Sequence, residues 1–165
     1  MQRSTLLGRG LLLAAAGVAG LVAAFAVAAH GSSSGNVRVV MTAKNKALGK
    51  TILVNLRGMT LYSLSAERHG RFICKDSACL ALWKPLVVAK GIKPTGVSGL
   101  TAVKRPDGKR QVAFRGAPLY RFVQDTKAGD IKGNGFKDVG VWRPVATTGT
   151  ATAPAKSSPM PSYGY

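Results

Sequence analysis

The stretch RGMTLYSLSAE at residues 57–67 recurs as RGAPLYRFVQD at residues 115–125. The two stretches align without a gap, so Arg-Gly, Leu-Tyr, an apolar residue and a carboxylate return in the same order. Further along, WKPL at residues 83–86 matches WRPV at residues 142–145. Two matches in the same order and at nearly the same spacing predict an internal duplication. We define copy one as residues 50–88 and copy two as residues 108–146.

Both copies carry the pattern of β-structure. Residues 51–56 and 60–64 form two strand-like runs around Arg57-Gly58, and residues 111–114 and 118–122 do the same around Arg115-Gly116. A strand, a glycine-containing turn and a second strand are typical of a hairpin. Residues 100–103 and 112–114 flank a Pro-Asp-Gly turn, which indicates a further hairpin. Residues 37–41 predict another strand.

One short helix is expected over residues 77–83, capped by Asp76 and ended by Pro85. Because one hairpin cannot bury an apolar face alone, the two copies should pack on each other. The predicted fold class is all-β with one short helix. We expect a small sandwich or half-open barrel built from two pseudo-twofold-related hairpin repeats, preceded by an N-terminal signal helix.

The first residues have the features of an export signal. Arg3 and Arg9 precede an uncharged apolar run over residues 11–29, and Ala26-Val27-Ala28 fits the small-x-small cleavage rule. Residues 1–28 are therefore predicted to be a signal peptide, with an uncleaved membrane anchor as the alternative. Either way the remainder is extracytoplasmic: in the periplasm, at the cell surface or secreted. We expect a flexible linker over residues 29–36, the β module over 37–146 and a disordered tail over 147–165.

The chain is strongly basic, with 24 Lys and Arg against 6 Asp and Glu and a net charge of +18. This charge predicts salt-sensitive attraction to polyanions. Outside the cytoplasm these are lipid head groups and polyanionic glycopolymers, and no specific nucleic acid is expected as a partner. The cations are scattered along the chain, so adaptation to the compartment is the alternative explanation.

Cys74 and Cys79 both lie in the exported part, where a disulfide is expected. The loop between them is short, so its closure should mainly fix local geometry. The spacing differs from that of thioredoxin-type motifs, and no His follows Cys79 to indicate covalent haem.

Several residues are candidates for a site. Glu67 and Asp125 occupy equivalent places, where they could bind a ligand, accept hydrogen bonds from turn N–H groups or pair with a neighbouring Arg. The metal content is unknown: Asp125, Asp130 and Asp138 lie on a glycine-rich loop and are weak calcium candidates, although the spacing matches no EF-hand.

The repeated aromatic residues allow two interpretations. They could form the core, or they could stack on a flat ligand such as a haem, flavin or quinone. The residues concerned are Tyr62, Trp83, Tyr120, Phe122 and Trp142.

No nucleophile elbow or phosphate-binding glycine loop is present in the sequence. We therefore predict an exported, non-enzymatic binding or structural module of the envelope with a strongly basic surface and no cofactor. The alternative is a redox or cofactor accessory protein of the cell envelope.

The same residues resemble a bacterial family of secreted-repeat proteins of unknown function. Many members are predicted lipoproteins marked by a Tyr-x-aromatic-x-x-Asp motif, which residues 120–125 match fully and residues 62–67 match in part. The family's Cys…Cys…Trp-Pro-Pro segment is similar to residues 74–85, and its Gly-Asp…Gly-x-Gly…Trp segment is similar to residues 129–142. The resemblance implies an extracytoplasmic β-rich domain and no particular activity. A lipid-modified cysteine is missing here.

Overall fold

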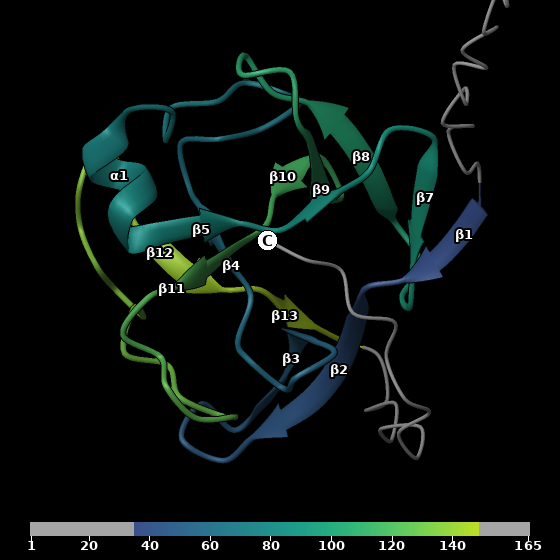
Figure 1. Cartoon of the computed structure of the whole chain (residues 1–165). Helices are drawn as coiled ribbons and strands as arrows, with labels where there is room; N and C mark the ends of the chain where they lie inside the picture. The colour runs from purple at the N-terminus through teal and green to yellow at the C-terminus, as the bar shows by residue number, and fades with distance from the viewer. Residues whose placement is uncertain (1–34, 149–165) are drawn as a thin grey trace, which may run out of the picture. The chain divides into compact units, whose positions relative to one another are not determined.

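The computed structural model describes residues 35–148. The predicted signal peptide and most of the predicted linker and tail lie outside these residues. In the described part, short strands and one short helix form open sheets, as predicted for the fold class (Figure 1). The helix α1 (Ser77–Leu82) has six residues, and nothing within residues 35–148 is a helix long and apolar enough to cross a membrane.

The central sheet has four strands in the order β12-β4-β11-β5. They are β4 (Tyr62–Leu64), β5 (Trp83–Pro85), β11 (Tyr120–Phe122) and β12 (Trp142–Pro144). In the middle, Tyr62 of β4 lies opposite Tyr120 of β11. The outer neighbour of β4 is β12, from copy two, and the outer neighbour of β11 is β5, from copy one. Each copy therefore contributes an outer strand that pairs with the inner strand of the other copy.

Two further sheets and one strand pair surround this centre. One sheet has the order β13-β3-β2, formed by β2 (Val40–Asn45), β3 (Lys50–Asn55) and β13 (Ala146–Thr147). In the other, β9 (Arg110–Phe114) pairs with β6 (Val87–Val88), β8 (Leu100–Lys104) and β10 (Ala117–Pro118). The parallel pair is β1 (Gly35–Arg38) with β7 (Ile92–Thr95).

Main-chain hydrogen bonds between the copies come in equivalent sets. Val145 N donates to Leu61 O at 2.9 Å, and Leu86 N donates to Leu119 O at 2.9 Å. Likewise, Ser65 N donates to Val141 O at 3.0 Å, and Val123 N donates to Leu82 O at 2.9 Å. These bonds fit the duplicated sequence, and the pseudo-twofold relation itself stays a prediction that superposition of the copies tests.

The local predictions hold at the helix and at one hairpin. Asp76 caps α1 by accepting a hydrogen bond from Cys79 N at 2.9 Å, and the helix ends at Leu82 because Trp83 is already extended. The hairpin β8–β9 forms around the predicted turn, where Gly108 N donates to Arg105 O at 3.0 Å.

The two repeated hairpins form at their Arg-Gly turns but are shorter than expected, and the first strand is divided. β3 pairs with the segment after Arg57-Gly58 only beside that turn, and β9 pairs with β10 only beside Arg115-Gly116. The next residues of each copy, β4 and β11, belong to the central sheet instead. β4 and β11 lie in the central sheet because their Tyr, Leu and Phe side chains pack in a core to which both copies contribute. The predicted strand over 37–41 is broken at Val39, whose N–H donates to Thr95 O at 3.0 Å.

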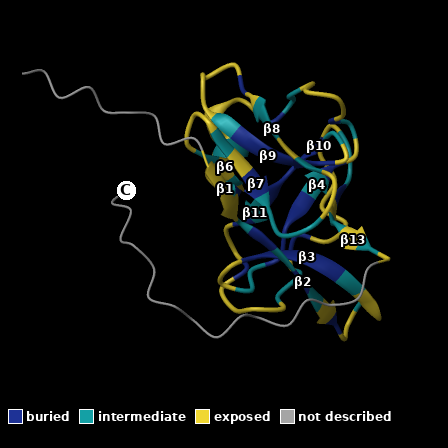
Figure 2. Cartoon of the chain, turned by 90° about the vertical axis from the view of Figure 1, so that its right-hand side faces the viewer, coloured by how far each residue is buried: buried dark blue, intermediate teal, exposed yellow. Residues whose placement is uncertain are grey.

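Two clusters form the core, and buried residues run along β3, β4 and β9 (Figure 2). The aromatic cluster consists of Tyr62, Leu64, Cys74, Trp83, Tyr120, Phe122 and Trp142. The aliphatic cluster consists of Val40, Leu53, Leu61, Val112, Phe114 and Leu119. Because side chains alternate along a strand, Tyr62 and Leu61 point to opposite sides of the central sheet.

Candidate functional site

Two tyrosine–carboxylate pairs cross between the copies at the centre of the molecule. The Tyr62 hydroxyl of copy one donates to Asp125 Oδ2 of copy two at 2.6 Å, and both residues are buried. Tyr120 of copy two lies near Glu67 of copy one, whose charge raises the pKa of the tyrosine hydroxyl, although Glu67 Oε2 is buried and accepts no hydrogen bond from the described residues. The repeated carboxylates therefore meet the repeated tyrosines, each in the opposite copy.

Each carboxylate also holds a loop of its own copy. Glu67 Oε1 accepts hydrogen bonds from Ile73 N at 2.6 Å and Cys74 N at 2.8 Å. Asp125 Oδ1 accepts one from Lys132 N at 2.9 Å. Buried carboxylates that accept main-chain N–H groups stabilise loops, because these donors would otherwise lack partners. This arrangement corresponds to the turn-binding interpretation of Glu67 and Asp125.

The environment keeps both tyrosines protonated. Burial raises the pKa of Tyr62 far above its usual range, and the hydrogen bond to Asp125 raises it further. Burial likewise raises the pKa of Tyr120, and the Glu67 charge adds to this rise while Arg105 opposes it. Both hydroxyls are therefore harder to ionise than that of an exposed tyrosine.

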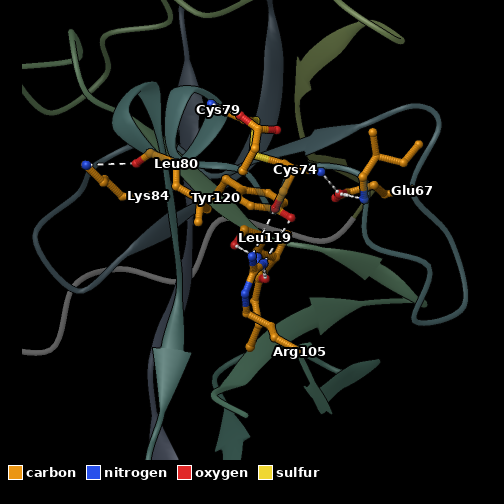
Figure 3. Close-up of a disulfide and its surroundings, with 11 residues drawn as sticks. Glu67, Cys74, Cys79, Leu80, Lys84, Arg105, Leu119 and Tyr120 are labelled. Carbon is orange, nitrogen blue, oxygen red and sulfur yellow. Dashed lines mark hydrogen bonds between the residues drawn. A yellow bond between two sulfur atoms is a disulfide. The ribbon is translucent and has the colours of Figure 1, made fainter. Parts of the chain in front are cut away.

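Arg105 is a buried member of this centre that the sequence reasoning missed (Figure 3). Its guanidinium donates to the Gln111 side chain and to Cys74 O, the latter at 3.0 Å, and its Nε lies 3.5 Å from Asp107 Oδ2. It also stacks over Phe72 at 4.9 Å. Arginine is usually exposed, so a place in a Pro-Asp-Gly turn gave no signal of burial.

The predicted disulfide is present between Cys74 and Cys79, with the Cα atoms 5.5 Å apart (Figure 3). It ties the loop that Glu67 holds to the helix α1. Cys74 N also donates to Glu67, and Cys74 O accepts from Arg105, so the disulfide lies next to the groups around Tyr120.

The repeated aromatic rings stack on one another. Trp83 and Trp142 are parallel, with centroids 3.8 Å apart, while Tyr62 meets Trp83 and Tyr120 meets Trp142 edge-on. Phe122 lies 4.5 Å from Trp83. All five rings are buried, so they form a core rather than an exposed stacking surface.

One cavity reaches this aromatic core from outside. It has a volume of about 420 Å³ and lies between α1, the disulfide and residues 136–139. Its walls include Trp83 and the partly exposed Phe136, and Asp76 and Asp138 line it as well. A ligand in this cavity would contact Trp83 and the disulfide.

The weak calcium candidates do not gather into a site. Asp125 is engaged with Tyr62, whereas Asp130 Oδ2 accepts hydrogen bonds from Thr126 N and Lys127 N at 3.0 and 3.1 Å. These main-chain donors, with that of Lys127 first, lower the pKa of Asp130. Within residues 35–148 no three acidic, His or Cys side chains are grouped to hold a metal ion.

Residues 101–146 match a family model described as a secreted repeat of unknown function. The match covers copy two, with its Tyr120 motif and Trp142, and confirms the resemblance over these residues. It supports the predicted extracytoplasmic location and assigns no activity. No curated protein and no solved structure matches the chain.

Proposed function

We propose that this protein is a non-enzymatic binding module of the cell envelope, held by its basic surface to anionic envelope components. The observation that carries the proposal is the use of the few acids for internal contacts. Glu67 and Asp125 are buried beside tyrosines, and Asp76 caps α1. Asp107 and Asp130 lie next to Arg105 and Lys132, and of the six acids this leaves only Asp138.

The cations are left without matching charges. All Lys and Arg residues except Arg3, Arg9 and Lys156 lie in the described part, yet only two ion pairs form there. Most of these side chains are exposed along the strands and turns. Such an excess of solvent-facing cations attracts polyanions over several ångströms, and salt screens this attraction.

The tyrosine–carboxylate centre supports a structural role rather than catalysis. Its hydroxyls are buried and protonated, and its carboxylates are occupied by loop N–H groups. A disulfide-closed scaffold of this kind keeps surface charges in fixed positions.

The test is retention of the purified protein on washed cells and on anionic vesicles. We expect retention to fall steeply between about 50 and 500 mM salt, because the screening length shortens over this range. Vesicles of neutral lipid serve as the control and should bind little. Retention that stays constant across the salt series rules out electrostatic binding.

The cofactor alternative stays a prediction, and the cavity beside Trp83 and Phe136 is the observation that favours it. Protein purified from its native host should then show a visible absorbance band. A colourless sample counts against a haem or flavin.

A further inference from the structure

The cavity beside the aromatic cluster lies at the boundary between the two copies. Copy one contributes α1, the disulfide and Trp83 to its walls, and copy two contributes residues 136–139. Its volume of about 420 Å³ is within the range of small-molecule sites, which occur preferentially where two domains meet. The buried Trp83 closes the inner end, whereas Phe136 and Val139 are 40% and 61% exposed and form the mouth.

The walls of the cavity are mainly apolar. Phe136 stands edge-on to Trp83, with the ring centroids 5.9 Å apart. Apart from the disulfide, the other apolar wall residues are aliphatic: Leu64, Ile73, Ala78, Leu82 and Val139. Such a lining favours a flat apolar group, because binding removes the group from water and brings it into contact with aromatic and aliphatic side chains.

The polar residues of the cavity differ from those of the chain as a whole. Asp76 and Asp138, two of the six acids, line the cavity together with one cation, Lys137. The lining therefore carries an excess of negative charge, although the net charge of the chain is +18. Neither carboxylate forms an ion pair with a cation of residues 35–148.

The two carboxylates are engaged to different degrees. Asp76 Oδ1 accepts a hydrogen bond from Cys79 N at 2.9 Å, and this main-chain donor lowers the pKa of Asp76. Asp138 N donates to Gly140 O at 2.9 Å, but the Asp138 carboxylate has no hydrogen bond to any described residue. An ammonium group is attracted both by a carboxylate and by aromatic rings, and this cavity offers the two together.

We propose that this cavity binds a small aromatic ammonium compound, with its ring against Phe136 and Trp83 and its charge beside Asp138. This inference goes beyond the proposed function, because the ligand is a small cation and not a polyanion. The exposed Lys and Arg side chains elsewhere repel such a compound, so its affinity has to come from the cavity itself.

The test titrates the purified protein with naphthalene probes that differ in charge. Naphthylmethylamine is a cation, naphthylmethanol is neutral and naphthylacetate is an anion, and isothermal titration calorimetry measures their affinities. Asp138→Asn removes the free carboxylate, whereas Ala89→Lys raises the net charge equally at an exposed residue outside the cavity. Ala78→Leu adds volume to the wall at a helical position that suits leucine. Near-UV circular dichroism checks that the variants are folded.

We expect the wild-type protein to bind the cationic probe about fivefold more tightly than the neutral one, the size of a favourable exposed ion pair. Asp138→Asn should abolish this preference and leave the affinity for the neutral probe unchanged. Ala89→Lys should change neither affinity by more than about twofold, because salt screens a distant charge. Ala78→Leu should weaken the binding of both probes, since both rings occupy the space that leucine fills.

Several results overturn the proposal. Equal affinities for the cationic and neutral probes would show a site without charge preference, and tighter binding of the anion would show that the overall charge dominates. Equal losses of cationic affinity in Asp138→Asn and Ala89→Lys would place the effect outside the cavity. Absence of binding by every probe at millimolar concentration also overturns it, and salt-dependent retention on anionic vesicles is measured independently of that outcome.

Discussion

The crossed pairs explain why a carboxylate recurs in so basic a chain. Glu67 and Asp125 each hold a loop of their own copy and meet a tyrosine of the other. A buried charge needs such hydrogen bonds, because removal of any partner leaves it unsatisfied. The motif residues therefore join the two halves of the module.

A double-mutant cycle should measure this link. We expect Tyr62→Phe to destabilise the fold by about 1.5–3 kcal/mol, because hydrogen bonds to charged groups have this size. Combined with Asp125→Asn, the two losses should not add, while Tyr62→Phe with Lys109→Ser should be additive. Urea unfolding provides the free energies. Additive losses for the Tyr62 and Asp125 pair would show that they are not coupled.

Alkaline pH should weaken the fold through the same tyrosines. The folded protein holds their protons more tightly than the unfolded chain, whose tyrosines titrate near pH 10. Their contribution is complete below that pH and falls above it, by about 1.4 kcal/mol per pH unit for each tyrosine. Urea unfolding between pH 8 and about 11 should show this loss. Replacing Tyr62 and Tyr120 with Phe should make the curve flatter, and an unchanged slope would contradict the assignment.

At this scale the sequence indicated which carboxylates matter but not their partners. The repeat identified Glu67 and Asp125, since both follow the Leu-Tyr step. Their tyrosines lie in the opposite copy, and that pairing depends on contacts between distant strands. Arg105 gave no signal, because its burial depends on the disulfide loop packed over it.

Among the connecting elements, the loop at Gly133 sits directly on the aromatic cluster. A Cβ built at Gly133 would lie 2.6 Å from Trp83 Cη2 and 3.0 Å from Phe122 Cγ. Both rings are buried in close contact with their neighbours, so they have little room to move.

Gly133→Ala should therefore destabilise the fold by about 1–3 kcal/mol, the usual size of overpacking in a core. Gly35→Ala is the control, because a Cβ there meets nothing within 4 Å. Thermal unfolding followed by tryptophan fluorescence compares the two. Equal melting temperatures for both variants would show that the loop can shift at no cost.

Elements with local signals were predicted well, and those set by distant partners were not. α1 and the β8–β9 hairpin follow from a capping aspartate and a Pro-Asp-Gly turn. The path of β4 and β11 into the central sheet follows from the shared core, which no local pattern encodes. β7 contains Pro94, which lowers strand propensity, and it was missed for that reason.

At the scale of the whole molecule, the central sheet needs strands from both copies. The pairs β4–β12 and β5–β11 both join residues from different copies, and Trp83 stacks on Trp142 across the same boundary. The duplicated pattern predicted that the copies pack together, but not that they exchange strands.

Fragments 35–96 and 97–148 should therefore lack fixed tertiary structure when separate and regain it when mixed. The reason is that each fragment exposes the unpaired strands and indole face that the other covers. Near-UV circular dichroism of the stacked tryptophans is the measurement, with an equimolar mixture containing the Tyr120→Ala fragment as a control for specificity. A native-like signal from either fragment alone would contradict the prediction.

The strand exchange has a consequence for how the two copies can diverge. Joined in one polypeptide, they meet at an effective concentration in the millimolar range rather than at that of the free protein. Copy one is therefore always paired with copy two, in a fixed one-to-one ratio. Because the two copies are permanently joined in one chain, their outer surfaces need not stay alike. Ser63 can stand where the second copy has Arg121, while the buried tyrosines and tryptophans stay the same in both copies.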